Sequence, residues 1–350
     1  IWGWYDAETE REIALPTTTA GLAFVDVTDP AAPVVLGRMT IGQNDPFVLW
    51  RDVKVYDDHA FVVSEHGGTS LIVFDLTRLR DMDSDQGLLE PDAVYDEFGN
   101  AHNIAINTET GFAYVVGSDT CEAGLHMVDI SDPQAPVNAG CFGEDGYTHD
   151  VECVVYHGPD TRYQGHEICF ASNEDTLTIV DVTDKDAPVM LSRNEYDSAA
   201  YTHQGAITPD HRFFLFGDEL DEQGGTVEGT TTYVTEVADL EDPTPIQAWT
   251  NGNASIDHNL YIEDDLVWAA NYSSGLRVYD YTTEGLRAGE LEEIAFFDVF
   301  PAGDPTEFAG AWTAYPHFPS GTVVVNSFDT GLFVLTSELS QPDPVAAEAE

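Results

Sequence analysis

Lysine is almost absent from this sequence, since only Lys54 and Lys185 occur among its 350 residues. Lysine and arginine together number 12, against 64 aspartate and glutamate residues, and the formal net charge is −52. Such a surface repels phosphate backbones, so the composition argues against nucleic-acid binding. It favours cationic partners, divalent metals or solubility at high ionic strength. The simplest interpretation is the solvated acidic coat of a halophilic (salt-adapted) or marine secreted protein.

Long apolar runs and several familiar motifs are also missing. No stretch approaches the roughly 20 apolar residues that cross a bilayer, so we expect no membrane-spanning segment. The sequence contains no Gly-x-Ser-x-Gly elbow, no phosphate-binding glycine loop and no His-Glu-x-x-His motif. It begins at Ile1 without an initiator methionine or a signal peptide, and we therefore expect a mature, processed chain.

Cysteine is scarce, and the spacing of the four residues predicts two pairs. Cys153 and Cys169 fall on opposite arms of one expected hairpin, and Cys121 and Cys141 flank another in the preceding repeat. We expect two local disulfides, Cys121 with Cys141 and Cys153 with Cys169, formed in an oxidising compartment. Zinc binding is the competing interpretation, but no Cys-x-x-Cys spacing supports it.

A short apolar phrase that usually ends in aspartate recurs along the whole chain. It occupies Gly21–Asp26, Ser70–Asp75, Gly124–Asp129, Thr176–Asp181, Thr231–Glu236, Gly275–Asp280 and Gly331–Thr336. The intervals between these starts are 44 to 56 residues. A strand-built repeat of about 50 residues is typical of a propeller, in which one small sheet cannot bury its faces alone. The terminal aspartates are expected to cap the turns that follow.

The segment around Ala101 shows the expected unit of four antiparallel strands, separated by turns rich in Gly, Asp and Pro. Seven such units, laid in register, begin near Trp2, Arg51, His102, His149, His203, His258 and Trp312. The last unit ends after its third strand at Thr336. We therefore predict an all-β, seven-bladed β-propeller of four-stranded blades over residues 1–336, in which the fourth strand of the last blade is either missing or supplied by residues that the repeat does not place. Residues 337–350 read as a C-terminal tail or linker.

Histidine occupies the first position of the innermost strand in four consecutive repeats. These residues are His102, His149, His203 and His258. In a propeller they would converge at one mouth of the central channel. Gathered imidazoles with carboxylates nearby suit a late first-row metal, so we expect a site for copper or zinc, with iron or nickel as alternatives.

Other side chains are expected around the same mouth. Trp2 and Trp312 would wall the pocket, and the loops after the second strands would add Glu65, His66, Glu174, Asp218 and Glu219. Arg51, Asp52 and Asp150 are the catalytic candidates, with Arg51 placed to hold an anionic substrate group. The acidic loop from Asp218 to Glu222 could bind calcium, although it does not match EF-hand spacing.

The repeated phrase resembles the LVIVD repeat, and longer strings resemble the choice-of-anchor B family. Those strings are Trp50–Tyr56, Ala101–Asn107, Gly146–Asp150, Ser172–Thr183, Asp257–Tyr261 and Phe318–Val323. The resemblance covers Ile1 to Thr336 and implies a secreted or surface-attached bacterial propeller whose tethering device lies at the C-terminus. A more distant similarity, in the idea of a histidine ring alone, is to the selenium-binding protein and methanethiol oxidase propellers, which hold copper.

Two functions remain open at this point. One is an extracellular propeller with a histidine-ring metal site, which could be an oxidase- or hydrolase-type enzyme acting on a small molecule. The other is a non-catalytic cell-surface module that binds a protein or glycan partner, with the histidines binding only water and backbone groups. An enclosed pocket over the ring would favour the first, and an exposed apolar patch elsewhere would favour the second.

Overall fold

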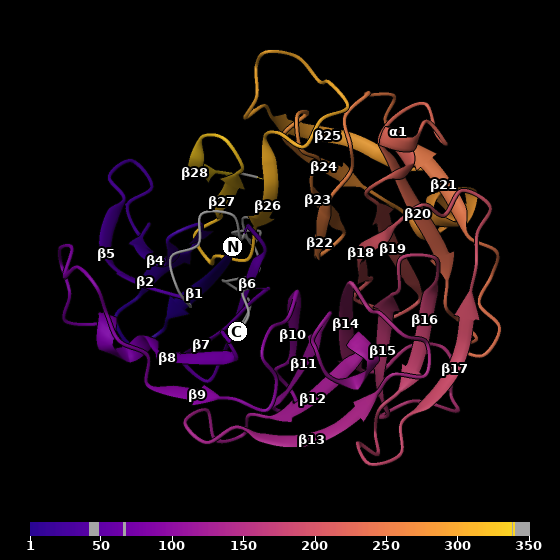
Figure 1. Cartoon of the computed structure of the whole chain (residues 1–350). Helices are drawn as coiled ribbons and strands as arrows, with labels where there is room; N and C mark the ends of the chain where they lie inside the picture. The colour runs from indigo at the N-terminus through magenta and orange to yellow at the C-terminus, as the bar shows by residue number, and fades with distance from the viewer. Residues whose placement is uncertain (42–48, 66–67, 338, 340–350) are drawn as a thin grey trace, which may run out of the picture.

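The computed structural model describes residues 1–41, 49–65, 68–337 and 339, which form seven antiparallel sheets around one axis (Figure 1). Blade one contains β1 (Trp2–Asp6), β2 (Arg11–Leu15), β4 (Gly21–Asp26) and β5 (Val34–Met39), with β3 (Thr17–Thr18) added beside β4. Blade two contains β6 (Arg51–Tyr56), β7 (His59–Ser64), β8 (Leu71–Asp75) and β9 (Ala93–Tyr95). Blade three contains β10 (Asn103–Asn107), β11 (Phe112–Val116), β12 (Leu125–Asp129) and β13 (Val137–Phe142).

The remaining blades repeat this meander. Blade four contains β14 (Asp150–Val155), β15 (Glu167–Ser172), β16 (Leu177–Asp181) and β17 (Val189–Asn194). Blade five contains β18 (Thr202–Ile207), β19 (Phe213–Asp218), β20 (Thr231–Glu236) and β21 (Gln247–Thr250). Blade six contains β22 (Asn259–Glu263), β23 (Leu266–Ala270), β24 (Leu276–Asp280) and β25 (Glu292–Phe297). Among the described residues, blade seven has three strands, β26 (Ala311–Tyr315), β27 (Thr322–Ser327) and β28 (Gly331–Thr336). The predicted propeller and its shorter last blade are confirmed.

The first strand of every blade faces the axis. Figure 1 shows β6, β10, β14, β18, β22 and β26 around the centre, and β1 lies beside both β6 and β26. Since β6, β10, β14, β18, β22 and β26 run in the same direction, the residues at their starts meet at one mouth of the channel. This arrangement places the sequence-distant histidines together.

The hydrophobic core lies between neighbouring blades, in seven clusters that each join two sheets. The repeated phrase supplies much of it; in blade four, for example, Leu177, Ile179 and Val180 are fully buried. Four of the terminal aspartates cap the next turn as expected, each accepting a hydrogen bond from the backbone amide two residues on. These are Asp26, Asp75, Asp129 and Asp181.

Contacts between blades seven and one close the ring. The buried carboxylate of Glu12 accepts hydrogen bonds from the backbone amide of Ser320 (2.9 Å) and from its hydroxyl (2.7 Å). Asn326 also donates to the carbonyl of Thr17, and Ile1 packs beside Tyr315 and Phe318. The two ends of the repeat array are thus joined by side chains, since no strand crosses between these blades among the described residues.

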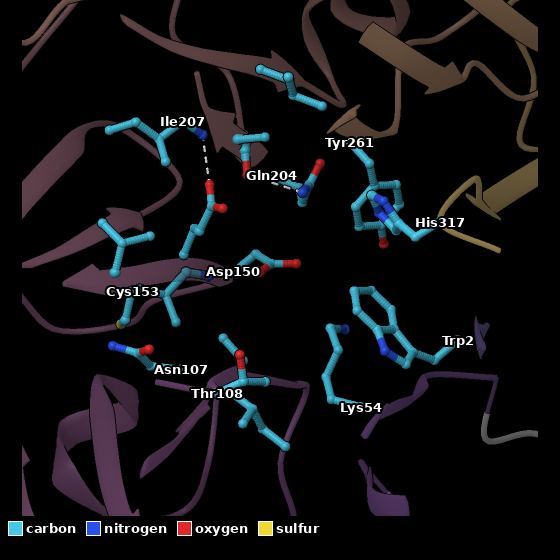
Figure 2. A pocket seen from close by; sticks show the side chains of 18 of the residues that line it. Trp2, Lys54, Asn107, Thr108, Asp150, Cys153, Gln204, Ile207, Tyr261 and His317 are labelled. Carbon is cyan, nitrogen blue, oxygen red and sulfur yellow. Dashed lines mark hydrogen bonds between the residues drawn. The ribbon is translucent and has the colours of Figure 1, made fainter. Parts of the chain in front are cut away.

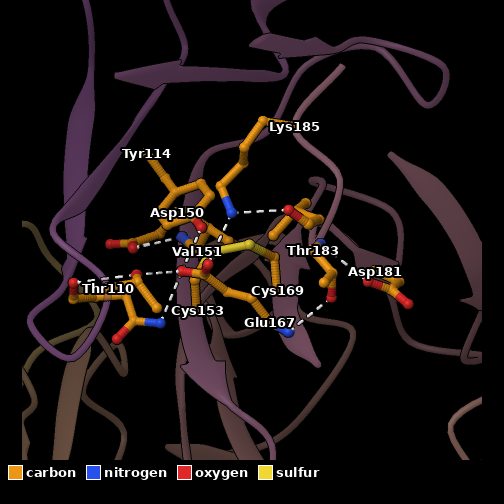
Figure 3. Close-up of a disulfide and its surroundings, with 12 residues drawn as sticks. Thr110, Tyr114, Asp150, Val151, Cys153, Glu167, Cys169, Asp181, Thr183 and Lys185 are labelled. Carbon is orange, nitrogen blue, oxygen red and sulfur yellow. Dashed lines mark hydrogen bonds and ion pairs between the residues drawn. A yellow bond between two sulfur atoms is a disulfide. The ribbon is translucent and has the colours of Figure 1, made fainter. Parts of the chain in front are cut away.

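Both predicted disulfides are present, Cys121 with Cys141 and Cys153 with Cys169. The second joins directly opposite residues of β14 and β15 (Figure 3). Beside it, Glu167 forms a 2.7 Å ion pair with Lys185 and accepts a hydrogen bond from the Tyr114 hydroxyl, which connects blades three and four.

Helix is rare in the part of the chain that the structure describes, where the α-helices are α1 (Asp221–Gly224) and α2 (Thr283–Ala288). None of these described helices has the length and apolar character that crossing a membrane requires. Of the expected tail over residues 337–350, only Ser337 and Leu339 are among the described residues.

Candidate metal centre at the channel mouth

Four imidazole rings from blades three to six lie side by side at the channel mouth, and we call His102, His149, His203 and His258 the histidine arc. Successive ring centroids are 4.2, 4.1 and 4.5 Å apart. Trp312 of blade seven continues the arc, with its ring 4.9 Å from that of His258. The register inferred from the repeat therefore brings these four histidines into one small polar cavity of about 40 Å³.

Glu219, which follows β19, supplies a carboxylate to one end of the arc. Its Oε2 lies 3.7 Å from Nε2 of His203, and its Oε1 lies 3.5 Å from Nε2 of His258. The Tyr272 hydroxyl donates a 2.5 Å hydrogen bond to Oε1 of Glu219. His203, Glu219 and His258 can thus each direct one ligand atom to a common point, because these atoms lie within 4.8 Å of one another.

Hydrogen bonds at Nδ1 fix which ring nitrogen of His149 and His258 remains available to bind a metal. Nδ1 of His149 donates to the carbonyl of His203 at 2.9 Å, and Nδ1 of His258 donates to the carbonyl of Trp312. A carbonyl only accepts, so these Nδ1 atoms carry the protons and the neutral rings keep lone pairs at Nε2. Nδ1 of His203 is buried with no hydrogen-bond partner among the described residues.

Burial decides the charge states in this cavity. Loss of solvent lowers the pKa of His258 to about 3 and holds the pKa values of His149 and His203 well below their usual range. Burial also raises the pKa of Glu219. His149, His203 and His258 are therefore neutral at pH 7, which is the form that binds metals.

The Nε2 lone pair of His258 faces Oε1 of Glu219, and when Glu219 is ionised two hydrogen-bond acceptors oppose each other at 3.5 Å. Two atoms bound tetrahedrally to one zinc ion at 2.0–2.2 Å lie about 3.4 Å apart. The measured separations of 3.5 and 3.7 Å are close to this value. A cation between these atoms would convert the repulsion into coordination.

Two further expected residues lie at the mouth. Nδ1 of His102 forms a 2.6 Å contact with Oε1 of Glu65, which orients this ring at the opposite end of the arc from Glu219. Arg51 is buried and lines the same cavity, together with Trp50 and Trp312.

Trp2 lies elsewhere than expected, in a larger cavity of about 320 Å³ farther along the channel (Figure 2). Its ring is 5.1 Å from that of Tyr315 and 5.9 Å from that of Tyr261, and Nζ of Lys54 sits 4.8 Å from its centroid. Tyr315, Tyr261 and Lys54 each lie three positions after the residue of their own blade that lines the mouth. Those mouth residues are Trp312, His258 and Arg51, respectively. The register in blade one is therefore displaced, and Trp2 corresponds to the fourth residue of the other innermost strands.

The carboxylate candidates Asp52 and Asp150 also point away from the histidine arc. Asp52 forms a 2.6 Å ion pair with Lys54. Asp150 lines the larger cavity, where Oδ2 accepts a hydrogen bond from Asn103, and burial raises its pKa to about 7. Adjacent residues of a strand face opposite sides, which separates Asp150 from His149.

The other acidic candidates have separate positions. Asp218 is buried and accepts hydrogen bonds from the amides of Ala200 and Tyr201 and from the hydroxyl of Tyr196, so it anchors the loop before β18. The side chain of Glu174 is exposed, although its backbone pairs with Thr202. His66 lies outside the described residues.

Some residues at these sites carried no signal in the sequence. Tyr272 contacts Glu219 only because blades five and six are neighbours, and no spacing indicates this. Lys54, Glu152 and Tyr261 line the larger cavity, and their place on the channel face of innermost strands was the available clue. Asp257 immediately precedes His258 of the histidine arc, but the carboxylates near it, those of Asp221 and Glu222, come from blade five.

Comparison with known proteins supports the fold. Residues 98–142, which include all of blade three, match the family model of the LVIVD repeat. The chain is therefore a seven-bladed β-propeller that contains an LVIVD repeat. No curated protein matches it.

Several solved structures share this architecture at low sequence identity. A protein of unknown function from Desulfotomaculum acetoxidans is 13% identical with a TM-score of 0.60, over 93% of this chain and 91% of that one. A protein from Lactobacillus plantarum is also 13% identical with a TM-score of 0.63, over 93% and 92%. The Cps50 (Swd1) β-propeller domain of Myceliophteria thermophila is 10% identical with a TM-score of 0.54, over 96% of both chains. At these identities the likeness concerns the fold alone.

Proposed function

We propose that the protein binds one transition-metal ion at the channel mouth through His203, Glu219 and His258. The proposal rests on the position of Glu219, whose carboxylate oxygens lie 3.7 and 3.5 Å from the Nε2 atoms of two neutral, buried histidines. The mixed nitrogen and oxygen donor set suits zinc or copper(II), and iron or nickel less specifically. Tyr272 would hold the carboxylate in place, and the Trp312 carbonyl would orient His258.

His149 lies beside His203, but its ring nitrogens do not belong to the group of ligand atoms that lie within 4.8 Å of one another. The three-residue ligand set therefore leaves a fourth position open to a small molecule. The cavity of about 40 Å³ is small and polar, so it suits water or a small ligand. When bound there, the metal would supply Lewis-acid activation of water or of a small ligand. Arg51 would attract an anionic ligand to the same cavity.

An extracellular location belongs to the same proposal. Two disulfides in a chain without free cysteine fit an oxidising compartment. The acidic composition fits a secreted protein at high ionic strength.

Metal analysis of protein purified without a histidine tag tests the metal site. After loading with Zn(II) or Cu(II) and gel filtration, we expect about one ion per chain. Glu219→Gln keeps the size of the side chain and should lower the affinity, and the double substitution of His203 and His258 by Ala should abolish binding. His157→Ala, which removes an exposed histidine outside the cavity, is the matched control. A loaded wild-type protein with less than about 0.2 ions per chain would refute the proposal.

A second candidate function is the binding of an extended segment of a partner protein at the edge of blade seven. In each of the other six blades the strand equivalent to β28 is covered by a fourth strand, whereas β28 pairs only with β27 among the described residues. Phe333 on β28 is only partly buried, and it packs against Phe297 of blade six, next to Phe296, which is 62% exposed. An unpaired edge beside apolar surface is suited to strand addition.

Hydrogen exchange of the β28 amides tests this second function. If the edge is open, the outward-facing amides of Gly331–Thr336 exchange rapidly in the purified chain and become protected only in the partner complex. Slow exchange in the purified chain would show that the edge is already filled and would contradict this function.

A further inference from the structure

Three carboxylates meet between blades five and six, separate from the ligand set proposed above. Asp221 and Glu222 belong to α1, which follows β19, and Asp257 comes from the loop that leads into β22. One oxygen from each lies within 4.8 Å of the others, and all three side chains are buried. We call these residues the carboxylate cluster.

Only part of the cluster is satisfied by hydrogen bonds. Oδ2 of Asp221 accepts from the Tyr233 hydroxyl at 2.6 Å, and Oε1 of Glu222 accepts from the Thr231 amide at 2.9 Å. Among the described residues, no hydrogen-bond partner exists for Oδ1 of Asp221, Oε2 of Glu222 or either oxygen of Asp257. Asp257 is only 3% exposed, so water does not solvate it from outside. Four oxygens thus remain to be satisfied.

The glycine at position 217 makes room for one of these unpartnered oxygens, Oδ2 of Asp257. A Cβ atom added to Gly217 would lie 1.7 Å from Oδ2 of Asp257. Any other residue at this point of β19 would displace the carboxylate. The backbone of blade five is therefore shaped around the buried, unpartnered side chain of Asp257.

Three buried carboxylates cannot all be ionised at this distance without a compensating charge. The cluster is neutralised either by protons or by a cation.

We propose that the carboxylate cluster is a second metal site, which binds a hard divalent cation, with calcium as the best fit. Calcium binds oxygen ligands at 2.3–2.6 Å, so two oxygens on one ion lie at most about 5 Å apart, as the cluster requires. The donors are all oxygen, unlike the nitrogen-containing set at the histidine arc. Magnesium fits less well, because it retains several waters and demands near-ideal octahedral geometry.

Such an ion would join blade five to blade six at the mouth. Glu219 lies two residues before Asp221, and His258 directly follows Asp257. The ion would therefore fix the backbone on both sides of the candidate transition-metal centre. This second site does not depend on the first, because the two ligand sets share no residue.

Calcium titration of the whole chain tests the proposal, after dialysis against a chelator and in about 0.5 M NaCl to screen the acidic surface. Calorimetry should show one saturable site, and calcium should raise the Tm. Terbium, used as a calcium probe, should luminesce through energy transfer from Tyr233, whose hydroxyl contacts Asp221. Asp257→Asn should weaken calcium binding by at least about tenfold. Glu222→Gln is the second variant, should Asp257→Asn fail to fold.

Two controls separate the possible outcomes. Glu228→Gln removes an exposed charge near the cluster and should leave calcium binding unchanged. His203→Ala should also retain it, so that failure of the proposed transition-metal site is distinguishable from failure of this one. The proposal is overturned if calcium, magnesium and manganese neither bind at one site nor change the Tm. It is also overturned if Asp257→Asn binds calcium as wild type does.

Discussion

The hydroxyl of Tyr272 donates a hydrogen bond of 2.5 Å to Oε1 of Glu219, and this bond joins blade six to the carboxylate of blade five that faces the histidine arc. The Tyr272 ring also packs 4.6 Å from that of His258. One side chain therefore positions both a carboxylate and an imidazole of the candidate metal centre.

Substitution of Tyr272 by Phe should weaken transition-metal binding by about 10- to 100-fold, the usual effect of removing a hydrogen bond to a metal ligand. The ring and its packing remain, so the fold should be unaffected. Competition with a chromophoric chelator measures the affinity. Tyr281→Phe removes a hydroxyl far from the mouth and serves as the control. Equal metal affinities in the two variants would show that the Tyr272 hydroxyl does not contribute to metal binding.

Glu152 in the larger cavity should make stability depend on pH. Burial raises its pKa to about 7, above the usual 4.5, although the amide of Ile207 donates to it. The folded state therefore holds a proton that the unfolded state has lost between these values, and this stabilisation disappears as the pH rises through 7. Glu152→Gln should gain stability over wild type between pH 5 and pH 8, by on the order of 1 kcal/mol. Urea unfolding at pH 5 and at pH 8 checks this. The prediction is contradicted if the difference in the free energy of unfolding between variant and wild type is the same at both pH values.

Replacement of Cys153 and Cys169 together by Ala should lower the free energy of unfolding by about 3 kcal/mol, because the bridge closes a loop of about 15 residues. Both positions lie in the buried core between blades, so part of the loss comes from packing. Urea midpoints measure the effect. The metal content should not change, since the bridge lies away from the mouth. A midpoint equal to that of wild type would refute the prediction.

Ring closure should depend on Glu12. Glu12→Ala leaves the amide of Ser320 without its buried acceptor and should cost about 2–3 kcal/mol, as expected for an unsatisfied group at a charged hydrogen bond. Glu8→Ala, on the exposed turn of the same hairpin, should stay within about 0.5 kcal/mol of wild type. Equal urea midpoints for the two variants would show that other contacts close the ring.

Much of the candidate site could be read from the repeat. The spacing of the repeated phrase placed His102, His149, His203 and His258 at one register, and circular closure then required them to meet. The same reasoning failed for Trp2, because blade one is displaced by three residues and its first residues face the larger cavity. The catalytic candidate Asp150 lies in the larger cavity instead, because side chains alternate along the strand and His149 points to the mouth.

The sequence by itself determined the propeller, the seven blades, the two disulfides and the gathering of histidines, because each follows from local periodicity and from the closure of a repeat array. The tertiary structure decided which carboxylates face the arc, since Glu65, Glu174, Asp218 and Glu219 all lie in similar loops and, of these, only Glu65 and Glu219 reach the rings. It also brought Asp257 to Asp221 and Glu222 across a blade boundary. Such contacts depend on loop conformation and on packing between blades, which a repeated spacing does not encode.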